Sequence, residues 1–259
     1  MEQSLGSKRI IASVLVFPGR LESTSSPVLR RISSGIAGLD EVTSGGIPES
    51  TVTMVYGPPK AGKSVFAYHF VAESIRKDEA VIIVTTDYDA DELSRAMSGF
   101  DWPIDDALKR GAIQLISMIP VKSSSTVKQA SLRSVSLANP TELMLCLSEI
   151  VGPIIQAKAR FRSIWDSLTP LFIYNPPMLV VKILREFSSK MKRAGAVGTL
   201  VTLVQGSIDL QSENIIKASV DNLVNLHPEG KLVVEGMLGT PRTSTPYSVT
   251  KAGIEVTHG

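Results

Sequence analysis

Residues 57–64 read GPPKAGKS and match the pattern G-x-x-x-x-G-K-[ST]. An apolar run at residues 51–56 precedes this stretch, and apolar residues at helical spacing follow it through residues 65–75. The order strand, loop, helix is the context that the pattern requires. The glycines let backbone N–H groups point at phosphate oxygens, and the N-terminus of the following helix adds a favourable dipole. The stretch therefore predicts a phosphate-binding loop, or P-loop, within an α/β fold.

Two side chains of the P-loop have separate predicted tasks. Lys63 would neutralise the β- and γ-phosphates of a nucleotide, and the Ser64 hydroxyl would contact Mg²⁺. A glycine-rich turn without a ligand is the alternative, but the pattern arises by chance in roughly one chain in a hundred of this size. We therefore expect ATP and Mg²⁺ as cofactors. The predicted nucleotide-binding residues are Gly57, Pro58, Pro59, Lys60, Ala61, Gly62, Lys63, Ser64 and Val65.

The composition limits the classes of protein that need to be considered. The chain has 259 residues, 43% of them hydrophobic, which is enough for one large or two small domains. A net charge of +2 gives no argument for nucleic acid or acidic membranes as partners. No apolar stretch reaches the roughly 18–20 residues of a membrane span. Three scattered histidines and one cysteine offer no metal-ligand spacing.

The single cysteine bears on the cellular compartment. Cys146 excludes an intramolecular disulfide framework and suits a reducing, cytoplasmic environment. Its neighbours Met144, Leu145 and Leu147 predict a buried apolar residue rather than a nucleophile. Residues 10–17 are apolar but short, with no clear cleavage site after them, so we do not expect a signal peptide.

Two regions are expected along the chain. Residues 1–29 form an N-terminal extension, in which residues 10–17 have the composition of a strand and residues 22–27 that of a linker. That strand would add to the edge of its own sheet, which we favour, or to that of a neighbouring molecule. Residues 30–259 form one domain in which strands alternate with helices, which predicts a mostly parallel sheet.

The expected elements follow from the apolar pattern. The predicted strands are residues 80–85, 113–117 and 199–204. The predicted helices are residues 89–98, a helix from Thr141 onward, and one whose apolar stripe is Val180, Leu184, Phe187 and Met191. Pro153 would restart its helix as a first-turn residue, and Gly195 would end the last one. Residues 120–140 lack periodicity and predict a loop or insertion, while short runs from Asn222 onward predict an antiparallel edge.

A magnesium site for ATP also needs a carboxylate, normally at the end of a strand beside the P-loop strand. Residues 161–167, FRSIWDS, have this form, because a short apolar strand ends at Asp166. An aspartate that only caps a following helix is the alternative. Given the P-loop upstream, we expect Asp166 to orient Mg²⁺ through a bound water.

Three separated stretches resemble one family. Residues 31–64, RISSGIAGLDEVTSGGIPESTVTMVYGPPKAGKS, are similar to the opening of KaiC-like ATPases of the RecA/RadA superfamily. Its pattern is matched by Gly35, Gly38, Leu39, Asp40 and residues 45–48. Residues 166–172, DSLTPLF, look like the family's Walker B segment, and residues 236–256 look like its C-terminal strands. The resemblance is greatest to single-domain archaeal members of the family.

The resemblance implies a fold and an activity. The expected fold is a RecA-like P-loop NTPase core over about residues 30–257, with a mostly parallel twisted sheet flanked by helices and antiparallel C-terminal strands. The family binds ATP with Mg²⁺ and often assembles into rings or filaments, so a homo-oligomer or a protein partner is expected.

Two departures from the family concern hydrolysis. The family usually carries one or two glutamates after its second strand to polarise the attacking water, and here Asp87 and Tyr88 occupy those positions. Asp87 is either a weakened base, because its side chain is one methylene shorter, or a structural residue. The family's Lys-Met-Arg-Gly segment reaches the neighbouring subunit's γ-phosphate, but residues 236–239 here read GMLG. Arg242 could substitute for the missing cation, although a solvated turn residue is its ordinary role.

A third departure concerns DNA. The recombinases of the superfamily bind DNA through two loops, which would follow Asp166 and residue 204 here. Residues 167–177 and 206–214 contain no Lys or Arg, and phosphate contacts need cations. These loops therefore argue against recombinase-type DNA binding. Gln205 stands where a glutamine senses the γ-phosphate in RecA-like proteins, and we include it with Asp87 as a candidate catalytic residue.

Three hypotheses remain from the sequence. The first is a regulatory protein that binds ATP·Mg²⁺, hydrolyses it weakly or not at all, and controls assembly or a protein partner. The second is an active RecA-family ATPase that works with a partner subunit. The third is a RadA paralogue that acts in DNA recombination or repair. We favour the first, because an intact P-loop and Asp166 stand beside a weakened base and a missing cation.

Overall fold

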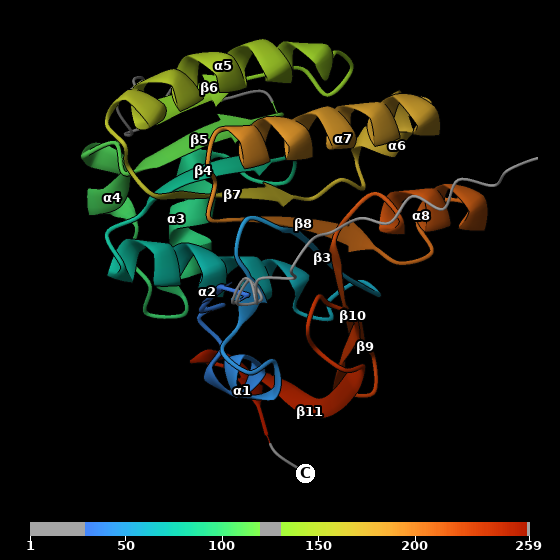
Figure 1. Ribbon diagram of the computed structural model, residues 1–259. Coiled ribbons are helices and arrows are strands. Elements are labelled where there is room, and N and C mark those ends of the chain that lie inside the picture. Colours follow the sequence, from blue (N-terminus) through green and yellow to red (C-terminus); the bar gives the residue numbers. More distant parts are fainter. Residues whose placement is uncertain (1–28, 120–130, 258–259) are drawn as a thin grey trace, which may run out of the picture.

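A ten-stranded sheet organises the part of the chain that the computed structural model describes, residues 29–119 and 131–257 (Figure 1). The strand order in this sheet is β12-β11-β10-β9-β3-β8-β7-β4-β5-β6, and a small sheet of β1 and β2 lies beside it. The strands are β1 Arg31–Ile32, β2 Ile47–Pro48, β3 Val52–Gly57, β4 Ala80–Thr85, β5 Ile113–Ser117, β6 Leu132–Ser134, β7 Phe161–Asp166, β8 Gly198–Val204, β9 Asn222–His227, β10 Lys231–Gly236, β11 Thr243–Thr250 and β12 Gly253–Val256.

The parallel part of the sheet runs from β6 to β9. β3 pairs in parallel with both β8 and β9, and the same direction continues through β7, β4, β5 and β6. β10, β11 and β12 are antiparallel. This confirms the expected fold class. β9 pairs antiparallel with β10 as predicted, but its other edge pairs in parallel with β3. A helix connects β8 to β9, and such a crossover leaves the two strands pointing the same way.

Helices cover both faces of the sheet. They are α1 Ala37–Val42, α2 Lys63–Arg76, α3 Ala90–Ser98, α4 Asp105–Lys109, α5 Thr141–Gln156, α6 Leu171–Tyr174, α7 Pro177–Arg193 and α8 Leu210–Lys217. Figure 1 shows α5 and α7 on one side of the central strands and α2 on the other. The central strands are buried along their length, which explains their continuous apolar sequence.

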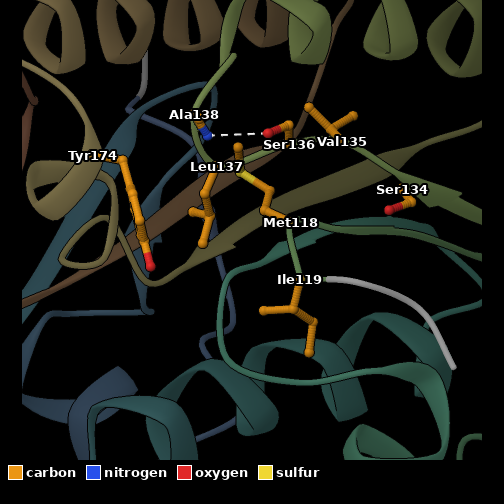
Figure 2. A pocket seen from close by; sticks show the side chains of 8 residues that line it. All are labelled: Met118, Ile119, Ser134, Val135, Ser136, Leu137, Ala138 and Tyr174. Atoms are coloured by element: carbon orange, nitrogen blue, oxygen red, sulfur yellow. Dashed lines mark hydrogen bonds between the residues drawn. The ribbon is translucent and has the colours of Figure 1, made fainter.

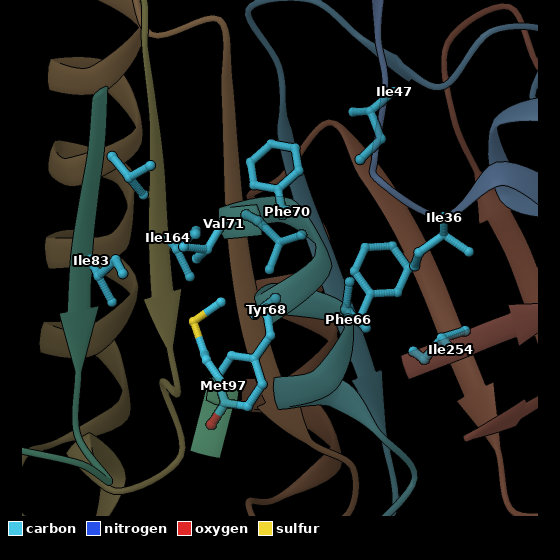
Figure 3. Packing of buried hydrophobic residues seen from close by; sticks show 14 of the residues in the cluster. Ile36, Ile47, Phe66, Tyr68, Phe70, Val71, Ile83, Met97, Ile164 and Ile254 are labelled. Atoms are coloured by element: carbon cyan, nitrogen blue, oxygen red, sulfur yellow. The ribbon is translucent and has the colours of Figure 1, made fainter. Parts of the chain in front are cut away.

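Two hydrophobic clusters hold these layers together. Figure 3 shows the one around α2, where Phe66, Phe70 and Val71 pack with Ile83 and Ile164 from the strands. The other cluster contains the predicted stripe of α7, in which Val180, Leu184, Phe187 and Met191 are all buried. The expected helix from this stripe is therefore present, and it ends just before Gly195, which has a φ of +83°.

The family-like glycine and aspartate residues near the start of the domain have structural tasks. Asp40 accepts hydrogen bonds from the Ser33 hydroxyl at 2.6 Å and from the Ser34 N–H at 2.8 Å, which closes the turn before α1. A Cβ on Gly35 would lie 2.6 Å from the carbonyl oxygen of His69, and one on Gly38 would lie 2.5 Å from that of Val256. Only glycine allows these close backbone contacts.

Several local predictions need correction. Pro153 lies inside the continuous helix α5 and does not restart it. Residues 132–134 form the edge strand β6 within the segment predicted as a loop, because β5 offers a free edge that a three-residue strand can pair with. Cys146 is half-buried rather than buried. The predicted strand at residues 10–17 and linker at 22–27 lie outside the described residues.

In the ranges that the structure describes, none of the helices combines the length and apolar character needed to cross a membrane.

Candidate functional site

The P-loop joins the end of β3 to the start of α2, as its pattern predicts. Gly57 ends β3, and a Cβ there would lie 2.3 Å from the carbonyl oxygen of Leu226 on β9. Gly62 caps α2 with a φ of +94°, a left-handed conformation that favours glycine. The loop leads directly into the N-terminus of α2, and the first N–H groups of a helix lack intrahelical partners and can bind an anion.

Lys63 is the buried cation of this loop. Its ammonium donates to the carbonyl oxygens of Gly57 at 3.0 Å and Pro58 at 2.7 Å. Burial lowers the pKa of Lys63, and the nearby charge of Asp166 opposes this shift. The ammonium therefore lies between the P-loop backbone and the carboxylate predicted to serve the metal.

Asp166 ends β7 and is buried, with 5% of its surface exposed. β8 lies between β7 and the P-loop strand β3, so Asp166 is not on a strand beside β3 as predicted. The Thr202 hydroxyl, on the intervening strand β8, donates a hydrogen bond to Asp166 Oδ1. Among the described residues Asp166 Oδ2 has no hydrogen-bond partner. Burial raises the pKa of Asp166, while Thr202, Ser64 and Lys63 lower it.

Asp87 follows β4 and is exposed. Its carboxylate lies near enough to Asp166 to contribute to the raised pKa of that group. Partial desolvation raises the pKa of Asp87, and the Thr86 and Ser167 hydroxyls lower it. Thr86 also accepts from the Ser167 N–H at 3.0 Å, so the segments after β4 and β7 are joined at this point. Asp87 therefore lies beside the predicted metal site, at the carboxyl ends of the parallel strands.

Gln205 follows β8 and lies next to the P-loop. Its N–H donates to the carbonyl oxygen of Gly57 at 2.9 Å, and its side chain is exposed. The N–H of the next residue, Gly206, donates to Glu213 Oε2 at 3.0 Å. The structure thus brings Gln205, Lys63, Asp166 and Asp87 to one end of the sheet.

Two hollows flank the P-loop. One, of about 250 Å³, is lined by Lys60, Gly62, Lys63, Ser64, Val65 and Val249. The other, of about 330 Å³, is lined by Pro58, Pro59, Lys60, Ala61, Pro228, Gly230, Tyr247, Ser248 and Val249. The Tyr247 hydroxyl donates to the carbonyl oxygen of Ala61 at 2.8 Å, so β11 braces the loop directly.

Several residues of this region were not found from the sequence. Thr202, Tyr247 and Val249 contact the P-loop or Asp166 only because strands distant in the chain meet there. None of the three residues belongs to a sequence motif. The sequence indicates only that each lies on a strand of the predicted sheet.

A third hollow lies at the carboxyl ends of β5 and β6 (Figure 2). Its volume is about 400 Å³, and its described lining is Met118, Ile119, Ser134, Val135, Ser136, Leu137, Ala138 and Tyr174. The described part of this lining contains no charged side chain.

Residues 236–239, which are predicted to lack the trans-acting cation, lie within the described part of the chain. Met237 is buried, while Leu238 is 62% exposed and Arg242 is exposed. Arg31 holds this segment by donating to the carbonyl oxygen of Leu238 at 2.9 Å. The side chain that extends into solvent at this position is therefore apolar.

The fold and the P-loop geometry together define the class: an α/β P-loop protein of the RecA type. Comparison with known families gives the finer assignment, because the KaiC ATPase family matches residues 32–258. The chain therefore belongs to the KaiC ATPase family.

Individual relatives agree with this assignment. A UPF0273 protein of Methanopyrus kandleri is 26% identical over 241 residues, which cover 88% of this chain and 92% of that protein. The circadian clock oscillator protein KaiC of Prochlorococcus marinus is 25% identical over 224 residues, which cover 86% of this chain and 42% of that protein. The crystal structure of a KaiC-like protein from Pyrococcus horikoshii matches with a TM-score of 0.71 and 22% identity, and the match covers 89% of this chain and all of that one.

Proposed function

We propose that this protein is a nucleotide-regulated binding protein. It binds ATP with Mg²⁺, hydrolyses the nucleotide weakly or not at all, and uses the bound state to control its own assembly or a protein partner. The observation that carries the proposal is the contrast between a fully formed phosphate-binding loop and incomplete hydrolytic machinery around it.

The phosphate-binding half of the proposal is supported by charge and backbone geometry. Lys63 is buried behind the loop with its ammonium held by two carbonyl oxygens. Phosphate oxygens would compete for the same ammonium with a full negative charge, which makes the stronger hydrogen bond. The hollow bounded by Lys60 and Val249 offers a place for the nucleoside.

The residues present fit Mg²⁺. Asp166 Oδ2 is buried without a partner among the described residues, and the Ser64 hydroxyl lies close enough to lower the pKa of that carboxyl. No described group of three or more His, Cys, Asp or Glu residues could hold a metal, so phosphate oxygens and water would supply the other ligands. When bound, the ion would supply positive charge to the phosphates.

Replacing the carboxylate tests this assignment. In Asp166→Asn the negative charge is lost while the size and the contact with Thr202 remain possible. We expect the gain in ATP affinity on adding MgCl₂ to shrink by about tenfold or more. The measurement is an equilibrium titration with and without MgCl₂, and an unchanged magnesium dependence would assign Asp166 a structural role only.

Weak hydrolysis is supported by the residues that occupy the positions of the family's glutamate and of its trans-acting cation. Asp87 is exposed and its side chain is shorter than the family's glutamate, and misplacing a base by about 1 Å costs on the order of a hundredfold in rate. The segment at residues 236–239 presents Leu238 where a cation is worth roughly 10³–10⁵ in rate. Together these substitutions favour retention of ATP over its turnover.

An active ATPase with a partner that donates the cation is the second candidate. It is favoured by the closeness of Asp87 to Asp166, which places a carboxylate beside the proposed metal. A role in DNA recombination has less support. The segments that follow β7 and β8 carry no Lys or Arg through residues 177 and 214.

The deciding experiment is single-turnover hydrolysis of labelled ATP beside an equilibrium ATP titration, both with MgCl₂. Tight binding with turnover near the uncatalysed background supports the regulatory protein. Hydrolysis at an ordinary ATPase rate would overturn it in favour of the second candidate. Absence of ATP binding would overturn both.

A further inference from the structure

A connected set of polar side chains lies on one face of β3, next to the P-loop. Glu213 of α8 accepts the Gly206 N–H at 3.0 Å and forms an ion pair with Lys217 at 2.7 Å. The Lys217 ammonium lies 3.8 Å from the centre of the Tyr56 ring, which is a cation–π contact. Tyr56 is buried and directly precedes Gly57, the first residue of the P-loop. The set therefore reaches from α8 to the strand that enters the loop.

The same set continues from Tyr56 to β10. The Tyr56 hydroxyl donates to Glu235 Oε2, and Asn225 of β9 donates to Glu235 Oε1 at 3.3 Å. Glu235 lies where the register between β9 and β10 shifts, between Val234 and Gly236. Such a bulge re-aims a side chain, and here it brings a carboxylate to Tyr56. Glu235 is also followed directly by the segment at residues 236–239.

The pKa shifts of Glu213 and Tyr56 favour the protonation states that their hydrogen bonds require. Burial alone would raise the pKa of Glu213, but the hydrogen bonds from Lys217 and the Gly206 N–H outweigh it and lower the pKa. Burial and the hydrogen bond to Glu235 raise the pKa of Tyr56, so its hydroxyl stays a donor. Apolar side chains of the same volume would fill this space without desolvating charges, so packing alone does not explain the set.

These side chains are connected to the proposed nucleotide site through the peptide group between Gln205 and Gly206. The bond from Glu213 fixes the N–H of Gly206, which belongs to the same peptide plane as the Gln205 carbonyl. The Gln205 N–H is fixed in turn by Gly57 at 2.9 Å. With both of its flanking peptides held, the backbone of Gln205 has one orientation relative to the P-loop.

We propose that Glu213, Lys217, Tyr56 and Glu235 form a positioning network that sets where Gln205 meets the γ-phosphate. The proposal rests on the nucleotide site proposed above. It makes α8 and the β10 bulge part of the discrimination between ATP and ADP, although neither contributes a side chain to the phosphates.

The test is the ratio of the ADP to the ATP dissociation constants, measured with MgCl₂ for the full chain. Glu213→Ala and Gln205→Ala should each lower this ratio by about tenfold through weaker ATP binding, with ADP binding unchanged. The double variant should lower it no further than either single variant, because both changes remove the same contact. A general loss of structure would weaken both nucleotides together.

Two further variants provide a conservative substitution at Glu213 and a control elsewhere in the chain. Glu213→Gln is nearly isosteric, can still accept the Gly206 N–H, and should lower the ratio less than Glu213→Ala, so it serves if the alanine variant does not fold. Glu73→Gln is the matched control: Glu73 is also a buried glutamate paired with a lysine four residues on, but at the far end of α2. Its ratio should equal that of the wild type.

Three results would overturn the network. These are equal weakening of ATP and ADP by the Glu213 variants, additive effects in the double variant, and a wild-type protein that binds both nucleotides equally. In each case nucleotide binding itself persists, so the proposed function stands. Failure of the wild type to bind either nucleotide would instead remove the function on which the network rests.

Discussion

At the scale of single residues, Lys63 carries the main test of the nucleotide site. Lys63→Ala removes the buried ammonium that phosphate oxygens would bind, and we expect ATP affinity to fall by at least about tenfold. Isothermal titration with ATP and MgCl₂ measures this. Lys77→Ala, just beyond the other end of α2, is the control and should bind as the wild type does. Unchanged affinity in Lys63→Ala would contradict the assignment of the P-loop.

At the same scale, Asp87 tests whether a shortened base accounts for the proposed weak hydrolysis. Asp87→Glu restores the side-chain length of the family's glutamate, and we expect single-turnover hydrolysis to rise by up to about a hundredfold. The same substitution at Asp106, an exposed residue of α4, should change nothing. A rate that stays at background in Asp87→Glu would show that the base alone does not limit turnover, and it would point to the absent cation at residues 236–239.

At the scale of elements, a buried ion pair joins β7 to the turn before β4. The Arg162 side chain is fully buried, contacts Glu79 Oε2 at 2.7 Å, and donates to the Ser33 carbonyl oxygen at 2.7 Å. Glu79→Gln leaves that guanidinium without its countercharge, so we expect a loss of about 3–5 kcal/mol in the free energy of unfolding. Urea denaturation measures this. Glu186→Gln in the exposed pair with Lys182 should cost less than about 1 kcal/mol.

At the scale of the whole molecule, His69 joins parts of the fold that are far apart in the chain. Its Nδ1 lies 3.0 Å from the Gly35 carbonyl oxygen, and its Nε2 accepts the Ile254 N–H at 2.7 Å. Nε2 must therefore be unprotonated, and burial lowers the pKa of His69 to about 4. Helix α2 is thereby fastened to the turn before α1 and to the last strand, β12.

This contact predicts how stability depends on pH. Between about pH 4 and 6.5 the unfolded chain binds a proton at His69 that the folded chain does not, so stability falls as pH falls through this window. The shift corresponds to about 3 kcal/mol. Urea denaturation at pH 7 and pH 4 should show a smaller loss in His69→Gln than in the wild type. His227→Gln is the control, and an unchanged loss in His69→Gln would contradict the contact.

The sequence predicted more of the fold than of the site's surroundings. The P-loop, the end of β7 at Asp166 and the stripe of α7 follow patterns that span a few turns or one strand, and the structure contains all three elements. The strand order was not predictable in this way. The insertion of β8 between β3 and β7, and the parallel pairing of β9 with β3, depend on which edges are free when the sheet assembles.

By itself the sequence determined the fold class, the place of the P-loop and the identity of the carboxylate that ends β7. These depend on local spacing, which the backbone periods of helix and strand translate directly into structure. Only the tertiary structure decided that Thr202 would hold Asp166, that Tyr247 would brace the loop, and that Glu213 would fix the peptide beside Gln205. Those contacts join strands and helices by long-range register, and no short pattern in the chain records which distant partner a side chain will meet.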